Sequence, residues 1–165
     1  MRIGILADTH DNLPMVDRAV ARLRGISPDL VLHAGDFVSP FVIPRLAALG
    51  RPCLGVFGNN DGDRALLAEA ARRSGTLQIA GSFTARLLDG RPVALLHGHE
   101  AGALEEVAGS GIFEAVIHGH THRASVTTTG GTLVVNPGEA CGYLTGRGTV
   151  AVLETGTMEA EILEI

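Results

Sequence analysis

The sequence predicts a single-domain α/β protein, and three observations support this prediction. Short apolar runs rich in β-branched residues alternate with segments of helical periodicity, as in strands joined by helices. Glycine-containing residue pairs separate several later apolar runs, as expected of hairpin turns. The 165 residues contain no repeat and no low-complexity linker, so we expect a single domain over residues 1–165.

The first half of the chain reads as three strand–helix pairs. Strands are expected at 2–7, 29–33 and 52–57, and helices at 13–24, 39–48 and 64–73. Pro14 suits the first turn of its helix, because a backbone N–H is not needed there. Asp11 and Asn12 are expected to cap that helix, with support of the functional site as the alternative. Asp61 and Asp63 precede the helix at 64–73 as caps. A role in the functional site is the alternative for both, and it is favoured more for Asp61, which belongs to a motif.

The second half is richer in strands. Three hairpins are expected, joined at Asp89-Gly90, Gly130-Gly131 and Thr155-Gly156. Their strands are expected at 83–88 and 92–96, at 124–129 and 132–135, and at 148–154 and 158–164. A helix at 102–109 precedes a further strand at 114–118.

Composition excludes several classes of function. All 13 basic residues are arginine, so mechanisms that need a lysine, including the phosphate-binding P-loop, are excluded. The net charge of −5 disfavours long nucleic acid as a partner. No apolar stretch is long enough to span a membrane, and the N-terminus does not read as a signal peptide. Cys53 and Cys141 are too few for a disulfide framework and suit the reducing cytoplasm.

Metal-binding side chains follow the predicted strands at the points where the strands end. They are Asp8 and His10, Asp36, Asn59, His97, and His120 and His122, after the strands at 2–7, 29–33, 52–57, 92–96 and 114–118. Because open α/β sheets bind ligands beyond the carboxyl ends of their strands, we expect these side chains at one edge. Glycines adjoin most of them, which permits close backbone approach.

The donors in this set are imidazole nitrogens, carboxylates and an amide oxygen, without a thiolate. Seven such residues with one shared carboxylate would supply two four-coordinate sites that leave room for solvent and substrate. This mixture suits manganese, iron, cobalt, nickel or zinc rather than a structural zinc site. Two such ions lower the pKa of bound water and neutralise phosphate charge, so no protein nucleophile is needed.

The ordered motifs D-x-H, G-D, G-N-x-D, H-G-H and G-H-T-H resemble those of the calcineurin-like metallophosphoesterases. The resemblance is strongest to the short YfcE-type phosphodiesterases of bacteria and archaea. It covers essentially all of residues 1–165, including the segments ILADTHDNLP, GDFVSPFVI, GNNDGDR and VVNPGEACGYLTG. It implies a four-layer α-β-β-α sandwich of two mixed sheets flanked by helices.

The resemblance also implies a function and a ligand set. The chain would hydrolyse phosphodiesters, with monoesters as a second option, by attack of a metal-bound hydroxide. The ligands of one ion would be Asp8, His10, Asp36 and His122, and those of the other would be Asn59, His97, His120 and the bridging, catalytic Asp36. Manganese is the expected metal. The expected substrate is a small phosphate ester, and relatives form dimers or tetramers, so a homo-oligomer is an open option.

The sequence departs from the family pattern at one position. Many relatives carry a histidine after the motif asparagine, where it gives a proton to the leaving group, and here that position is Asn60. An amide does not act as an acid, which favours diesters with good leaving groups. Asn59, Asn60 and His99 are the expected substrate-binding residues, and His99 is the candidate that replaces the missing acid.

Other candidates have structural roles as their preferred interpretation. His33 lies within its strand and His118 ends one, so both are expected to be packed and hydrogen-bonded. Arg64 and Arg123 are expected at the surface, with a phosphate contact as the alternative.

Three rival functions remain open at the level of sequence. Cys141 and Arg147 satisfy the C-x5-R pattern of cysteine-dependent phosphatases, but a strand rather than a helix follows. A scaffold protein on the same fold, as in retromer, would tend to lose ligands. A metal-dependent nuclease would need a surface that grips nucleic acid.

Overall fold

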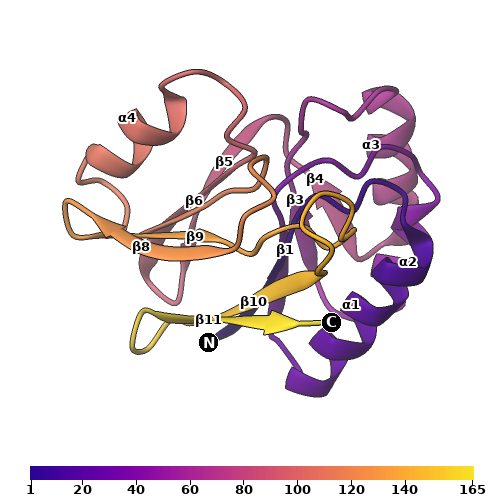
Figure 1. Ribbon diagram of the computed structural model, residues 1–165, viewed down its shortest axis with the longest axis horizontal. Coiled ribbons are helices and arrows are strands. Elements are labelled where there is room, and N and C mark those ends of the chain that lie inside the picture. Colours follow the sequence, from indigo (N-terminus) through magenta and orange to yellow (C-terminus); the bar gives the residue numbers. More distant parts are fainter.

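The computed structural model describes residues 1–165 and arranges them in four layers, with helices outside two facing sheets (Figure 1). In spatial order the first sheet contains β11 (Glu159–Glu164), β10 (Thr149–Glu154), β1 (Arg2–Leu6), β2 (Leu30–His33), β3 (Cys53–Gly55) and β4 (Leu77–Ile79). The second contains β5 (Phe83–Leu88), β6 (Arg91–Leu96), β7 (Ala115–Ile117), β9 (Thr132–Asn136) and β8 (Ser125–Thr129). The helices are α1 (Leu13–Ile26), α2 (Val42–Ala47), α3 (Arg64–Ser74) and α4 (Ala103–Gly109). The expected sandwich of two mixed sheets is confirmed.

Strand direction explains where a site can form. In the first sheet β1, β2, β3 and β4 are parallel, whereas β10 and β11 add antiparallel pairs. In the second sheet β6, β7 and β9 are parallel, and β5 and β8 are antiparallel edge strands. Each sheet therefore presents the carboxyl ends of three or more parallel strands at one edge, which is where open α/β sheets bind ligands.

The alternation of side chains along each strand builds the two sides of the first sheet. Ile3 and Ile5 on β1 are fully buried against the second sheet, in a cluster that also contains Leu95 and Ile117. Leu6 and Val31 belong to the opposite cluster, which α1, α2 and α3 cover. Because successive strand residues point to opposite faces, an apolar run without alternation is the expected sequence for such a doubly covered strand.

The outer face of the second sheet is covered more sparingly. Only α4 packs there, through a cluster of buried residues that includes Ala94, Val116 and Ala108. Figure 1 shows α4 over this sheet and the three other helices on the far side of the first sheet. The edge strand β5 is left with exposed apolar side chains, among them Phe83 and Leu87.

Three expectations about elements need correction. The strand β4 was not predicted, because three residues are too few to show a period. The helix expected at 39–48 begins only at Val42, because Val38 before it adopts a left-handed φ of 77° and the chain turns at 39–41. The expected side-chain cap of α1 is absent, since Asn12 donates to the Cys141 carbonyl (2.8 Å) and Asp11 accepts from the Ser39 hydroxyl.

None of the helices has both the length and the apolar character that a membrane crossing requires.

Candidate metal centre

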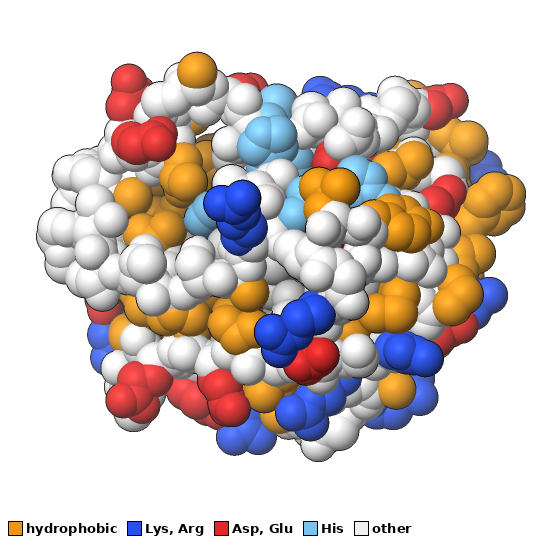
Figure 2. Space-filling view, in the orientation of Figure 1, with side chains coloured by type: hydrophobic (Ala, Val, Ile, Leu, Met, Phe, Trp, Pro, Cys, Tyr) orange, Lys and Arg blue, Asp and Glu red, His pale blue; other side chains and the backbone are white.

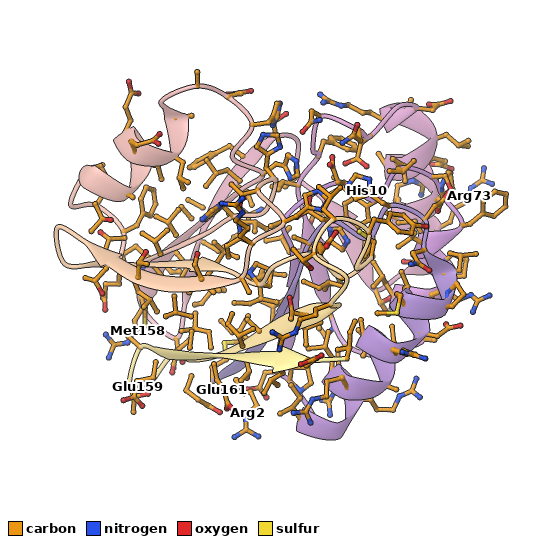
Figure 3. The ribbon with its side chains drawn as sticks, viewed as in Figure 1. Arg2, His10, Arg73, Met158, Glu159 and Glu161 are labelled. Carbon is orange, nitrogen blue, oxygen red and sulfur yellow. The ribbon has the colours of Figure 1, made fainter.

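Backbone hydrogen bonds between loops assemble the site at the carboxyl edge of the strands. The N–H of Asp8 donates to the Gly35 carbonyl (3.0 Å), which joins the loops after β1 and β2. The N–H of Cys141, in the loop after β9, donates to the Asp8 carbonyl (3.1 Å) and ties the second sheet to the first. Met158 lies in the turn that joins β10 and β11. Figure 3 shows the labelled His10 at the opposite end of the molecule from this turn.

Four predicted ligands form a first cluster. The ligand atoms of Asp8, His10, Asp36 and His122 all lie within 4.8 Å of one another. The Oδ1 atom of Asp8 lies 3.6 Å from Nε2 of His122 and 3.9 Å from Nε2 of His10. Both Asp8 Oδ1 and His10 Nε2 are buried without a hydrogen-bond partner. Unpaired buried polar atoms are costly, so this cluster fits a divalent cation that would satisfy them.

The remaining predicted ligands form a second cluster beside the first. Nε2 of His97 lies 3.0 Å from Oδ1 of Asn59 and 3.4 Å from Oδ2 of Asp36. The ring of His120 lies 5.2 Å from that of His97, centroid to centroid. The same Asp36 oxygen is 3.3 Å from Nε2 of His10 in the first cluster. All seven predicted ligands therefore lie in one continuous group, with the Asp36 carboxylate between its two halves.

Hydrogen bonds from the rear nitrogen orient two of the histidines. Nδ1 of His97 donates to the Ala34 carbonyl (2.7 Å), and Nδ1 of His122 contacts Oε2 of Glu139 (2.7 Å). Both contacts leave Nε2 facing the clusters. Such partners fix the tautomer and orientation of metal-binding histidines. The carboxylate–histidine pair formed by Glu139 is a functional contact that the sequence analysis missed.

Glu139 is positioned by the strand edge that also positions the predicted ligands. It lies three residues beyond β9, which runs parallel to β7. The side chain is fully buried and also accepts hydrogen bonds from the backbone of Leu144 and Thr145. Applying the strand-end rule to β9 as well as to the other parallel strands would have found it.

The backbone of the site is unusual. Five of the predicted ligands have positive φ angles: Asp8 (51°), His10 (41°), Asp36 (60°), His120 (69°) and His122 (60°). Such angles are uncommon outside glycine, and they concentrate at functional sites where the surrounding structure holds them. The loops therefore hold their side chains in conformations that propensity alone would not select.

Asp61 braces the loop that carries the shared carboxylate. Its side chain accepts hydrogen bonds from the N–H groups of Asp36 (3.2 Å), Val38 (2.7 Å) and Gly58 (2.7 Å). It does not cap α3, a role that Asp63 fills by accepting from the Leu66 N–H (2.9 Å). Asp61 thus belongs to the support of the site rather than to the helix.

The clusters are strongly coupled electrostatically. Burial raises the pKa of Asp8 to about 6, outweighing the neighbouring histidines that lower it. Burial also raises the pKa of Asp36. Contacts with His10 and His97 outweigh this effect and hold the pKa of Asp36 well below its usual range. The Asp36 carboxylate in turn raises the pKa of His10. Protons held in this way are released when a cation binds to the same atoms.

The candidate substrate-binding residues lie at the rim of the clusters. Asn59 and Asn60 are exposed, and Nδ2 of Asn60 donates to Oδ2 of Asp36 (2.7 Å). The ring of His99 lies 5.4 Å from that of His97, and its Nδ1 is buried without a partner. Figure 2 shows histidine side chains reaching the surface near the top of this face.

His33 and His118 have the structural roles expected of them. His33 is fully buried, stacks on Phe37 with 3.7 Å between ring centroids, and contacts the Thr9 hydroxyl (3.2 Å). Burial lowers its pKa to about 3, so the ring is neutral. His118 is buried beside Asn136 and lies outside both clusters.

Both arginines are exposed, as expected, and they differ in their contacts. Arg64 donates to the Gly58 carbonyl (2.9 Å) and lies over the Phe57 ring, so it supports the loop that carries Asn59. Arg123 is exposed, as expected of a surface residue.

The geometry contradicts a cysteine nucleophile. The Cys141 thiol donates to Oε2 of Glu139 (3.1 Å), and burial raises its pKa to about 12. The Arg147 guanidinium is paired with the carboxylate of Glu164 (2.7 Å). A protonated, buried thiol beside a carboxylate is not an activated nucleophile.

A larger hollow lies away from the clusters. It has a volume of about 740 Å³ and runs along β3 and β4 between Leu54, Leu77 and Leu88. It contains none of the predicted ligands, so pocket size alone would have indicated the wrong place.

Comparison with known proteins agrees with the fold and shows the family. The family model of the calcineurin-like phosphoesterase superfamily domain matches residues 1–158. Phosphodiesterase MJ0936 of Methanocaldococcus jannaschii is 39% identical over 159 residues, which are 96% of each chain. The solved structure of a novel archaeal phosphodiesterase superimposes with a TM-score of 0.94 at 37% identity, with 100% of both chains covered. The YfcE phosphoesterase of E. coli shares the fold at 18% identity, with a TM-score of 0.74 and 100% of both chains covered.

The two facing sheets and the carboxylate, imidazole and amide donors at their edge define a hydrolase of the metal-dependent phosphoesterase class. The chain belongs to the calcineurin-like phosphoesterase superfamily, as its motifs indicated. This membership implies divalent metal ions as cofactors, and the first cluster supplies candidate ligands for them.

Proposed function

We propose that the chain is a dinuclear phosphodiesterase that also accepts monoesters as poorer substrates. The observation that carries the proposal is the position of Asp36, one oxygen of which lies 3.3 Å from Nε2 of His10 and 3.4 Å from Nε2 of His97. A carboxylate between two groups of donors is the arrangement that a pair of bridged cations requires. The diester preference is supported by the identity of 39% to a named phosphodiesterase.

The proposed ligands divide as the clusters do. Asp8, His10, Asp36 and His122 would hold one ion, and Asn59, His97, His120 and the shared Asp36 would hold the other. Manganese is the proposed metal, with nickel, iron, cobalt and zinc as alternatives, since nitrogen and oxygen donors suit all five. When bound, such ions activate water and neutralise the charge of the phosphate.

The chain's own residues orient the reactants. Asp36 is the proposed catalytic carboxylate, because it fixes the separation of the two sites. Asn59 and Asn60 are exposed at the rim and offer amide groups to phosphate oxygens. An asparagine cannot protonate a leaving group, so esters of acidic alcohols or phenols are the proposed substrates.

His99 is the proposed proton donor. Its ring lies 5.4 Å from that of the proposed ligand His97, and its Nδ1 atom is buried without a partner. We expect His99→Ala to lower kcat about 10²-fold, a magnitude typical of general acids, without loss of bound metal. The measurement is turnover of a diester together with the metal content of the same sample. Unchanged turnover would exclude this role.

The decisive experiment compares metals and substrates in one series. Protein stripped with chelator is supplied with manganese, nickel, magnesium or zinc and assayed against bis(4-nitrophenyl) phosphate and 4-nitrophenyl phosphate. Metal-dependent hydrolysis that is faster for the diester supports the proposal. A chain that takes up less than two ions and hydrolyses neither ester would be a scaffold instead.

We further propose one metallophosphoesterase domain over residues 1–165, acting in the cytoplasm on a small substrate. The cytoplasmic proposal is supported by Cys53 and Cys141, which are both free and buried. The mass measured by light scattering on the same preparation decides whether the chain is a monomer, a dimer or a tetramer.

A further inference from the structure

A small pocket lies directly beside the candidate metal centre. Its volume is about 180 Å³, and its wall includes the proposed ligand His97 and the proposed proton donor His99. It forms where the start of β5, the end of β6 and the helix α4 meet, three elements that Figure 1 places on the side of the second sheet. A group entering it would therefore be adjacent to the His97 half of the site.

We propose that this pocket binds one aromatic ester group of the substrate, uncharged and about the size of a single ring. The inference rests on the proposed function and specifies its substrate. Three properties of the pocket carry it: volume, charge and an unpaired polar atom.

The volume matches one ring. A cavity of about 150 Å³ lined by apolar side chains is known to bind benzene, so about 180 Å³ accommodates a ring with a small substituent. The apolar part of the wall is made by Phe83, Leu96, Ala103 and Val107. Phe83 packs edge-on against Phe113, with 6.4 Å between ring centroids, which holds an aromatic wall in place.

The charge of the wall disfavours a second anionic group. The lining contains no arginine, its one carboxylate is Glu100, and its only imidazoles are those of His97 and His99. A pocket for a further phosphate would need cationic or N–H donors, because an anion next to a carboxylate is repelled. A neutral group is therefore favoured, which distinguishes a simple aryl ester from a nucleoside polyphosphate.

His99, which carries the unpaired atom, lines the pocket and lies beside the ligand His97, at the junction of the pocket and the metal centre. Nδ1 of His99 is buried without a partner, and the His99 ring lies 6.2 Å from that of His120. A ring in the pocket joined to phosphorus through oxygen would bring that oxygen to this junction.

The test measures binding of two phosphonates to the manganese-loaded protein by isothermal titration calorimetry. Phenylphosphonate and methylphosphonate present the same anion and differ only in the group that would enter the pocket. We expect phenylphosphonate to bind about tenfold or more tightly, because burying a ring is worth at least the free energy of a factor of ten. Equal affinities would overturn the proposal.

Two variants locate the binding. Ala103→Leu fills the pocket and is expected to reduce the preference to about twofold or less, with methylphosphonate affinity unchanged. Ala101→Leu, the same change at an exposed residue outside the lining, keeps the preference. Phe83→Ala removes the aromatic wall and is expected to lower the preference as well. A full preference in both Ala103→Leu and Phe83→Ala would refute the assignment.

Methylphosphonate affinity also reports whether each variant is folded. Weak binding of both phosphonates by the unmodified, manganese-loaded protein, together with no diester hydrolysis, would overturn the proposed function and this inference with it. Equal binding of both alongside normal hydrolysis would overturn the pocket alone.

Discussion

Gly58 lies so close to the shared carboxylate that it leaves no space for a side chain. A Cβ atom at this position would be 2.1 Å from Oδ1 of Asp36 and 2.6 Å from its backbone nitrogen. Neither neighbour moves freely, because Asp36 Oδ1 accepts the Asn60 N–H (2.9 Å) and the Asp36 N–H donates to Asp61 (3.2 Å). The glycine therefore sets the position of the carboxylate between the two clusters.

We expect Gly58→Ala to displace Asp36 and to reduce tightly bound metal to below half that of the unmodified protein. The measurement is metal content by mass spectrometry after dialysis. Gly62→Ala is the matched control, because a Cβ at Gly62 would meet nothing within 4 Å. A Gly58→Ala variant with full metal content would show that the contact is relieved without moving the carboxylate.

Glu139 provides a second test at the residue scale. Its carboxylate holds His122 from behind at 2.7 Å, and loss of such a partner typically costs 10- to 100-fold in metal affinity. We expect Glu139→Gln to weaken manganese binding by about that factor in a direct titration. Glu161→Gln, an exposed change on β11, is the control. An unaltered affinity would mean that His122 is oriented by packing alone.

At the scale of single elements, α3 depends on one capping side chain. Asp63 accepts the Leu66 N–H at 2.9 Å, and no other side-chain cap is present at the start of α1, α2 or α4. We expect Asp63→Ala to lower the free energy of unfolding by about 1 kcal/mol, measured by urea denaturation. Asp63→Ser should restore most of the loss, because serine also caps. A serine variant as unstable as the alanine variant would contradict capping as the cause.

The elements themselves were largely predictable because their apolar periods are local. The runs at β1, β2 and β6 are continuous, and no end of these strands differs from the prediction by more than one residue. What could not be predicted depends on distant contacts. Asn12 fails as a cap because it is drawn to the carbonyl of Cys141, 129 positions along the chain. β4 is a strand only because Gly55 and its neighbours on β3 pair with it.

The site shows the same division between local and distant causes. Its donors are identifiable because each follows a strand and because parallel strands end at one edge. The backbone conformations of these donors could not be predicted from the sequence. The positive φ of His120, for example, is held partly by its N–H, which donates to Oδ2 of Asp8 in the other sheet (3.1 Å). The role of Glu139 is likewise invisible until β9 is known to lie parallel to β7.

At the scale of the whole molecule, the interface between the two sheets is apolar in one part and polar in another. Their middle is an apolar cluster of 15 buried residues, whereas the carboxyl edge is polar. The proposed ligands there come from both sheets. The loops of the first sheet supply Asp8, His10, Asp36 and Asn59, and those of the second supply His97, His120 and His122. Bound cations would therefore join the two sheets where apolar packing is lacking.

Because bound ions would join the two sheets, we expect metal binding to raise the Tm of the protein. A ligand that binds only the folded state contributes about 2.7 kcal/mol at 100 times its Kd, which corresponds to a rise in Tm of about 5–10 °C for a chain of this size. The measurement is thermal unfolding with chelator and with increasing manganese. Asp36→Asn should abolish most of the rise, since it removes the ligand common to both halves, whereas Gly62→Ala should retain it. If Asp36→Asn keeps the full rise, the stabilising ion is held elsewhere and the two sheets are not joined through this carboxylate.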